Sequence, residues 1–221
     1  QIKSPRSPMT KYQRKNLIRE YKWLLFFPIL AYMMLTVLRD FCEDFAIELW
    51  NETHQNKNLF LFTQTSTLSG LIVMCLIGLI FLIKDNFKAF RIIHFFIILG
   101  FLVTVFSTFL YQLNILSSVS WMIMSTTGLY MGYVASNTIF YERFIASFKL
   151  VGNVGFAMYM ADAFGYLATV LVLIGNDYFK LTNSWVHFFS TLFYSSGIIG
   201  VILMAISIFR FSRKYQKFSH A

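Results

Sequence analysis

The sequence predicts an all-α membrane protein with six transmembrane helices, and its composition and hydropathy pattern carry that prediction. Hydrophobic residues make up 57% of the 221 residues and charged residues only 13%, whereas soluble domains carry about 25% charged residues. So few charges cannot cover a soluble globule, and disorder would require low hydrophobicity. The net charge of +9 is scattered between apolar runs. That pattern is typical of a chain facing anionic lipid and argues against a nucleic-acid partner.

Six apolar runs are long enough to cross a bilayer. A helix that spans about 30 Å of hydrocarbon needs about 20 apolar residues, and the alternating pattern of a membrane barrel is absent. We therefore expect a basic segment at residues 1–22, a transmembrane domain at residues 23–209 and a basic tail at residues 210–221. The expected spans are approximately Trp23–Cys42, Leu59–Ile83, Ile92–Leu113, Trp121–Phe140, Leu150–Gly175 and Trp185–Phe209.

The basic residues predict the orientation of these spans. Sixteen of the nineteen Lys and Arg residues fall in segments on one side of the predicted topology. The other side carries only Arg39, Lys57 and Lys180. Because cytoplasmic loops carry an excess of Lys and Arg, we expect both termini in the cytoplasm and the chain in the inner membrane of a cell, with the lipid bilayer as its first partner.

The first span has a charged outer end. Its charge-free run, residues 23–38, covers only about 24 Å as a helix, so Arg39 and Asp40 must approach the hydrocarbon. Arg39 precedes Glu43 by four residues, a spacing that lets the two pair on a helix. One interpretation is an interfacial charge cluster that caps the span. The other sets Arg39 at the mouth of a cavity, where it attracts an anionic group of a substrate.

Spans two and four each carry a polar face. The second contains TQTSTLSG at residues 63–70, with Gln64 among six hydroxyl or amide side chains. Such groups seldom face lipid, so they line a wet cavity or bond to a neighbouring helix. In the fourth span Tyr130, Tyr133 and Asn137 share one helical face with Tyr141, which we interpret as cavity lining.

Small residues in the fourth span predict close helix packing. Gly128, Gly132 and Ser136 recur every four residues on a face next to the tyrosines. This small-xxx-small spacing lets two helix backbones approach each other in a membrane. We therefore expect one face of this helix to pack against a neighbour while the other contacts solute.

Asp162 is the most informative residue of the sequence. Twelve uncharged residues precede it in the fifth span and fourteen follow it, and an aspartate at such a depth costs about 2.5–3.5 kcal/mol on insertion scales. Tyr159 and Tyr166 lie three residues before and four residues after it, on its own helical face. Two interpretations fit equally: a carboxylate that couples transport to a proton or cation or contacts a cationic substrate, and a structural hydrogen bond or ion pair between helices.

Catalytic and metal-binding patterns are absent from the sequence. There is no G-x-S-x-G, H-E-x-x-H, P-loop or paired-cysteine motif. We therefore expect neither an enzyme nor a metal or other cofactor. Both His94, near the inner end of the third span, and His187, near the outer end of the sixth, are expected at the membrane interface.

Three stretches carry a resemblance to a known class of protein. They are RSPMTKYQRKN (6–16), LTVLRDFCEDFAIELW (35–50) and, most specifically, SNTIFYERFIASFKLVGNVGFAMYMADAFGY (136–166). Nearly the whole chain resembles the C-terminal half of an uncharacterised bacterial family of membrane proteins similar to the major facilitator superfamily. The resemblance implies a facilitator-type half bundle of six helices. It also implies that residues 1–22 form the loop that joins two halves, so that a further six-helix half is missing from this chain.

The loop after the second span departs from the superfamily pattern. The stretch FLIKDNFKAFR (81–91) keeps Asp85 and a basic residue, Arg91, but Phe81 and Lys88 stand where the G-x-x-x-D-R-x-G-R-R signature has glycine. The resemblance implies that Asp85 and Arg91 gate the cytoplasmic side.

The leading functional hypothesis is a secondary transporter. It would move a small polar or anionic organic solute by alternating access, with the solute bound between the two halves and with ion coupling as an option. The alternative is a non-transporting membrane sensor or scaffold with the same fold, in which Asp162 is structural.

Overall fold

The computed structural model describes residues 9–53, 60–150, 153–179 and 184–219, and within them the chain is helical with no strand. The remaining residues include parts of the two expected basic segments, residues 1–8 and 220–221, and the expected start of the second span at Leu59. The helices are α1 (Lys11–Asp44), α2 (Ala46–Glu52), α3 (Phe60–Phe81), α4 (Asn86–Gln112), α5 (Ser118–Ala135), a π-helical turn η1 (Ser136–Phe140), α6 (Tyr141–Ser147), α7 (Val154–Phe179) and α8 (Trp185–Ser219).

Within the described residues, five helices are long and apolar enough to cross a membrane: α1, α3, α4, α7 and α8. Their outer surfaces are apolar. On α4, the side chains of Phe95, Leu99, Leu102, Phe106 and Phe109 recur at helical spacing, and each is about half exposed. A helix that presents such a stripe away from its own bundle needs an apolar solvent. The fold is therefore that of a multi-pass, all-helical membrane protein.

The expected fourth span, Trp121–Phe140, is divided. The structure has α5, then the π-helical turn at Ser136–Phe140, and then α6. A π-helical turn adds one residue to a helix, so every side chain after it is rotated by about 100° relative to an unbroken α-helix. The helical run continues past the expected end to Ser147.

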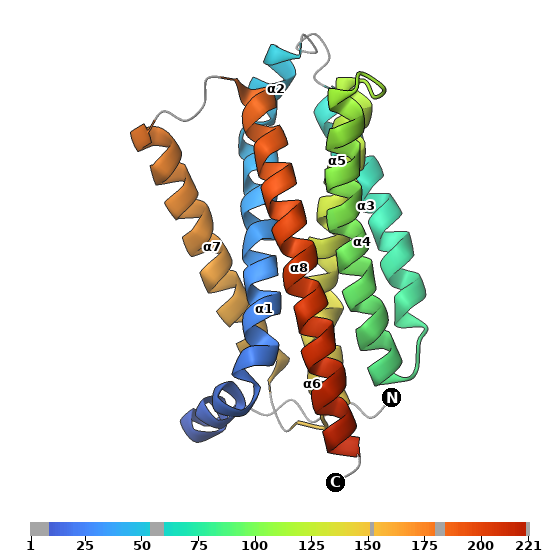
Figure 1. Cartoon of the computed structure of the whole chain (residues 1–221), viewed down its shortest axis with the longest axis vertical. Helices are drawn as coiled ribbons and strands as arrows, with labels where there is room; N and C mark the ends of the chain where they lie inside the picture. The colour runs from blue at the N-terminus through green and yellow to red at the C-terminus, as the bar shows by residue number, and fades with distance from the viewer. Residues whose placement is uncertain (1–8, 54–59, 151–152, 180–183, 220–221) are drawn as a thin grey trace.

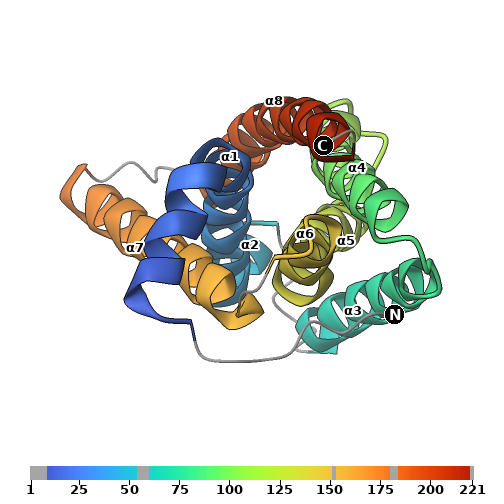
Figure 2. The same ribbon diagram turned by 90° about the horizontal axis from the view of Figure 1, so that it is seen from below.

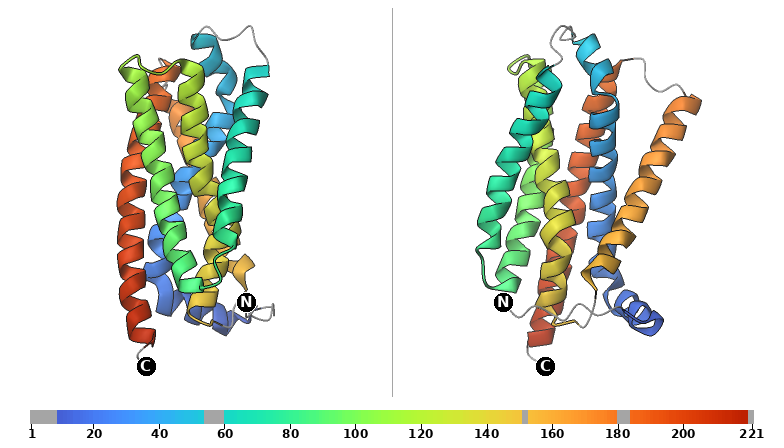
Figure 3. Two further views of the ribbon diagram at one scale, coloured as in Figure 1. Left: turned by 90° about the vertical axis from the view of Figure 1, so that its right-hand side faces the viewer. Right: turned by 180° about the vertical axis from the view of Figure 1, so that it is seen from behind.

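Four helical elements form a ring, and two flank it. Helix α1 packs against α8, α8 packs against α4, α4 packs against α5, and α5 closes the ring on α1. Helix α3 packs outside α5, and α7 packs outside α1 (Figures 1 and 2). Seen from below, α3 and α7 flank one side of the ring and α8 lies on the opposite side (Figure 2). Figure 3 shows α7 leaning away from the ring towards its C-terminal end.

The expected basic segments continue the transmembrane helices. Helix α1 begins at Lys11 with a capping box, in which the Thr10 hydroxyl accepts from the Gln13 amide at 3.3 Å and the Gln13 side chain accepts from the Thr10 amide at 2.9 Å. Its first turns swing across the lower end of the bundle (Figure 2). Helix α8 runs past the expected end of its span to Ser219.

The expected close packing of the fourth span is confirmed at Gly128. A Cβ atom there would lie 2.5 Å from the carbonyl oxygen of Gly100 on α4, so the two helix backbones touch. The expectation for His94 is wrong. Its side chain is fully buried, with Nδ1 2.9 Å from the carbonyl of Phe90 and Nε2 3.0 Å from the hydroxyl of Ser207 on α8. Because both ring nitrogens have protein partners, this histidine joins α4 to α8 instead of facing the interface.

Candidate functional site: a polar junction of α1, α5 and α7

Polar side chains from three helices meet where α1 lies between α5 and α7. Their hydrogen bonds and ring contacts connect segments more than ninety residues apart in the sequence. We call this group the polar junction, and its members are Tyr32, Arg39, Asp40, Tyr133, Asp162 and Thr169.

Asp162 is bound to α1 by one hydrogen bond. The hydroxyl of Tyr32 donates to its Oδ1 at 2.6 Å. Tyr32 is 2% exposed, and its ring stacks on that of Tyr133 from α5, with centroids 5.4 Å apart and planes 13° apart. Asp162 follows the start of α7 at Val154 by eight residues, or about 12 Å along the helix. The carboxylate thus lies deep in the span, on the N-terminal side of its centre.

Helices α1 and α7 run in the same direction and touch at three successive levels. At the middle level the α7 backbone meets the side chain of Thr36, because a Cβ atom on Gly165 would lie 2.7 Å from the Thr36 hydroxyl. Above it, the Thr169 hydroxyl donates to Oδ2 of Asp40 at 2.7 Å. Asp162, Gly165 and Thr169 therefore form one face of α7, which continues the contact that Tyr32 begins. Glycine at position 165 is what allows the helices to come this close.

Arg39 pairs with its neighbour Asp40, not with Glu43 as its spacing suggested. Its Nε donates to Oδ1 of Asp40 at 2.9 Å, and Nη1 bonds the Tyr133 hydroxyl. The guanidinium carbon also lies 4.5 Å from the ring centroid of Tyr133 and 5.9 Å from that of Tyr166. The ion pair is only partly exposed, with 17% and 13% of the two side chains accessible. Arg39 is thus held among aromatic rings, where its charge is only partly hydrated.

The charges of the polar junction do not cancel. Arg39 forms its ion pair with Asp40, and no cation of the described chain forms an ion pair with Asp162. One arginine against two aspartates leaves a formal charge of −1. Asp162 is a half-buried carboxylate with a phenol as its donor, which is an arrangement that suits a bound proton or cation.

A buried hydroxyl without a partner lies beside the junction. Tyr141, the first residue of α6, is 1% exposed, and its hydroxyl has no hydrogen-bond partner among the described residues. Counted through the π-helical turn, Tyr141 falls within about 20° of Tyr133 around the helix, instead of the 80° of an unbroken α-helix. The turn at Ser136–Phe140 therefore places this phenol on the side of the helix that carries Tyr133.

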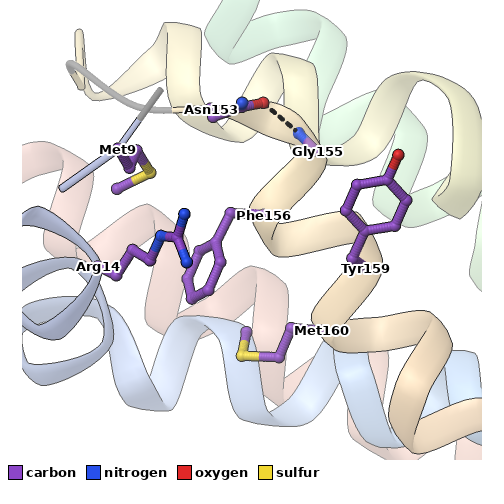
Figure 4. A pocket seen from close by; sticks show the side chains of 7 residues that line it. All are labelled: Met9, Arg14, Asn153, Gly155, Phe156, Tyr159 and Met160. Atoms are coloured by element: carbon purple, nitrogen blue, oxygen red, sulfur yellow. Dashed lines mark hydrogen bonds between the residues drawn. The ribbon is translucent and has the colours of Figure 1, made fainter. Parts of the chain in front are cut away.

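Four of the predicted site residues lie apart from the polar junction. The Tyr130 hydroxyl donates to Glu43 at 3.3 Å, above the junction. Asn137 is half-buried within the π-helical turn. Gln64 is exposed and lines a shallow hollow of about 510 Å³ on α3. Tyr159 is 76% exposed and lines a hollow of about 530 Å³ near the first turns of α1, together with Arg14 (Figure 4).

The polar half of α3 divides between its two expected roles. Ser69 is buried and bonds across to α5, where its hydroxyl donates to the Ile123 carbonyl at 3.2 Å and accepts from Thr127 at 3.0 Å. The neighbouring side chains of Thr63 and Thr67 are exposed with Gln64 at the hollow on α3. One face of this stretch therefore fastens α3 to α5, and the other is open.

The two predicted gate residues have separate partners. Asp85 caps α4, and its carboxylate accepts from the Lys88 amide at 3.0 Å. The Arg91 guanidinium lies 5.8 Å from the ring centroid of Phe87. No ion pair joins Asp85 to Arg91 in the described structure. A gating role for the two stays a prediction.

The sequence profile of a family of unknown function, DUF5690, matches residues 1–214 of this chain. The chain belongs to this family. No curated protein and no solved structure matches the chain. The function of this DUF5690 member is therefore inferred from the geometry of its polar junction. Among the described residues, no group of three or more His, Cys, Asp or Glu side chains comes together that could hold a metal ion.

Sequence reasoning missed three residues in or beside the polar junction of this DUF5690 member. Tyr32 and Thr169 bond the two aspartates, and Tyr141 was placed on the tyrosine face without its rotation towards Tyr133 by the π-helical turn. The available signal was a tyrosine within the charge-free run of the first span, since a buried phenol in a membrane needs a partner. Nothing in the sequence indicated which carboxylate that partner would be.

Proposed function

We propose that this chain is the C-terminal half of a secondary transporter of the facilitator type in the inner membrane. It crosses six times, through α1, α3, α4, α5 with α6, α7 and α8, and both termini lie in the cytoplasm. A second six-helix half completes the protein. The two halves move a small polar or anionic organic solute by alternating access, and Asp162 binds the coupling proton or cation.

The observation that carries the proposal is the small number of partners that Asp162 has in the described chain. A carboxylate about 12 Å inside a membrane helix requires compensation, yet it has one phenolic donor and no cationic partner in the described chain. A purely structural acid is normally matched with a cation or several donors, because an unpaired charge is costly in hydrocarbon. A coupling site must instead leave the carboxylate free to take and release a cation.

The charges suggest how coupling works. With Asp162 charged the junction carries a formal −1, which repels an anionic solute. Binding a proton or cation at Asp162 removes that charge, and Arg39 then offers a partly dehydrated guanidinium to a carboxylate or phosphate group. Ion and anionic solute would therefore bind together. The residue that links the two sites is Tyr133, which contacts both Tyr32 and Arg39.

The open side of the bundle supports the position of the second half. Helices α3 and α7 flank one side of the ring (Figure 2), and they are the least buried of the five long helices. Gln64 on α3 and Tyr166 on α7 are both exposed. A six-helix half that packed on this side would cover them and enclose a polar space beside the junction.

The test is a screen of small polar and anionic solutes for uptake by cells that express the complete gene. A transported solute is expected, with uptake that depends on an imposed proton or sodium gradient. Asp162→Asn should remove that dependence while the protein still accumulates in the membrane. Unchanged uptake and unchanged gradient dependence in the variant would refute the coupling role.

The alternative, a non-transporting sensor or scaffold, is favoured by one observation. The Tyr32–Asp162 hydrogen bond joins α7 to α1, as the hydrogen bond of a structural acid would. In that case Asp162→Asn loosens α7, and the protein fails to accumulate. A screen that finds no solute, combined with that loss, supports the alternative.

Cysteine labelling checks the proposed orientation. In a background with both native cysteines replaced by serine, Ile115→Cys lies in the exposed connection between α4 and α5, and Lys84→Cys in that between α3 and α4. A membrane-impermeant maleimide should label position 115 in intact cells and position 84 only after lysis. The reverse pattern would contradict cytoplasmic termini.

A further inference from the structure

A groove runs between α1 and α8, away from the polar junction. Its volume is about 1270 Å³, and it is lined by the C-terminal part of α8 and by Glu20, Trp23 and Leu24 of α1. Figure 1 shows that α1 begins and α8 ends at the same end of the bundle. One end is basic and the other apolar. Trp23 of α1 lines the groove beside Arg210. We call it the α1–α8 groove.

Among the described residues, the basic end of the α1–α8 groove carries more cations than anions. It is lined by Arg210, Arg213, Lys214 and Lys217, against the single carboxylate of Glu20. No ion pair involves any of these five side chains in the described structure. The Lys214 ammonium donates to the backbone carbonyl of Glu20 instead. The mouth of the groove therefore carries a formal charge of +3.

Aromatic rings hold two of these cations in place. The Arg210 guanidinium lies 5.5 Å from the Trp23 ring centroid and 5.2 Å from that of Phe27. The Arg213 guanidinium lies 4.2 Å from the Phe209 ring centroid. Cation–π contacts orient a guanidinium without neutralising it. Two charges are thus fixed at the border between the basic mouth and the apolar wall.

The apolar end of the α1–α8 groove is open on its outer side. Ile202 on α8 is 53% exposed, Phe209 is 56% exposed and Trp23 is 50% exposed. Leu24 and Ile206 also line the groove. A surface that changes from several unpaired cations to aliphatic side chains along one groove matches a molecule with an anionic head and a hydrocarbon tail.

We propose that the α1–α8 groove is a binding site for an anionic phospholipid of the bilayer leaflet that faces this end of the bundle. The phosphate of the headgroup lies among Arg210, Arg213 and Lys217, and one acyl chain lies along the aliphatic wall of α8. The charge match and the apolar wall together favour a lipid over free phosphate, because free phosphate has no hydrocarbon chain to contact the wall. The site is independent of Asp162 and of transport.

Brominated lipids test the proposal, because bromine on an acyl chain quenches tryptophan fluorescence only at close range. The purified full-length protein is reconstituted in phosphatidylcholine vesicles that contain a small fraction of brominated phosphatidylglycerol or, in parallel, brominated phosphatidylcholine. The signal of Trp23 is obtained by difference from Trp23→Phe. We expect the anionic quencher to act on Trp23 at a much lower mole fraction than the zwitterionic one.

Matched variants separate a site from general surface charge. Arg213→Gln with Lys217→Gln should reduce the preference for the anionic lipid by about fivefold for each cation removed at low salt. The control removes the same charge at the start of α4, with Lys84→Gln just before the helix and Lys88→Gln in its first turn, and should leave the preference unchanged. Ala205→Phe fills the apolar wall without altering charge and should also weaken quenching by phosphatidylglycerol.

Three results would overturn the proposal. Equal quenching by the two lipids would show that the groove does not select a charge. Equal losses in the groove variant and the control variant would show that only surface charge matters. No quenching of Trp23 by either lipid would show that another part of the full-length protein covers the groove.

Discussion

The hydrogen bond between Tyr32 and Asp162 makes a quantitative prediction. Tyr32→Phe removes the hydroxyl and keeps the ring, so the stacking on Tyr133 is retained. Polar contacts between membrane helices contribute about 0.6 kcal/mol on average and about 1.7 kcal/mol at most. Here the acceptor is a carboxylate, the distance is 2.6 Å, and Tyr32 is the one donor to Asp162 within the described part of the chain. We therefore expect a coupling free energy in the upper half of that range, about 1–1.7 kcal/mol.

A double-mutant cycle isolates this coupling. The free energy of unfolding is measured in mixed detergent micelles for the wild type, Tyr32→Phe, Asp162→Ala and the double variant. Tyr130→Phe is the matched control, because its hydroxyl bonds Glu43 at 3.3 Å in an exposed position, and its loss should cost less than about 0.5 kcal/mol. A coupling below about 0.3 kcal/mol, the usual limit of additivity for independent sites, would refute the claim that this bond joins α1 to α7.

Further predictions concern helix packing and the cysteines. Gly128→Ala should destabilise the protein by about 1–3 kcal/mol, because the added Cβ would lie 2.5 Å from the Gly100 carbonyl oxygen. The control Gly78→Ala adds a Cβ with nothing within 4 Å and should be neutral or stabilising by up to about 1 kcal/mol. Equal thermal-unfolding midpoints for the two variants would contradict this packing. Cys75 is exposed on the surface of the chain and Cys42 is 7% exposed. In the detergent-solubilised protein N-ethylmaleimide should therefore modify Cys75 at least about tenfold faster, since an opening that costs about 1.4 kcal/mol precedes reaction at Cys42. Equal rates would show that α1 is looser than described.

The sequence was sufficient to predict the membrane class, because hydropathy depends on the order of residues along the chain and not on their tertiary contacts. Each expected span overlaps helical structure in the described residues, because a run of apolar residues specifies its own approximate length. Helix ends were less predictable. Charged residues at Lys11–Lys22 and Arg210–Ser219 continue α1 and α8 instead of ending them, because a cationic helix remains stable at a membrane surface.

The polar junction was only half predictable. Asp162 was identifiable because a carboxylate inside an apolar run has no other explanation. Its donor Tyr32 lies 130 residues away, and only the side-by-side course of α1 and α7 brings the two together. Arg39 pairs with the adjacent Asp40 and not with Glu43, because Tyr133 bonds Nη1 of Arg39 and Thr169 bonds Oδ2 of Asp40. Such choices depend on helix neighbours, which local spacing does not specify.

The π-helical turn accounts for the remaining difference. A face drawn from 3.6-residue periodicity includes Tyr130 and Tyr141 together, but one added residue at Ser136–Phe140 rotates Tyr141 away from Tyr130 and towards Tyr133. No residue in that stretch is a proline or glycine that would mark it. His94 differs for a related reason, because its burial depends on Ser207 of α8, which lies 113 residues later.

The most direct test of the central claim is the uptake of a solute from the screen by full-length Asp162→Asn, measured with and without an imposed ion gradient, beside the amount of folded protein in the membrane. If Asp162 binds the coupling ion, the variant should accumulate to the wild-type level, and its uptake should no longer respond to the gradient. Tyr32→Phe, which keeps the carboxylate, should still respond. Gradient-dependent uptake that persists in Asp162→Asn would contradict the claim.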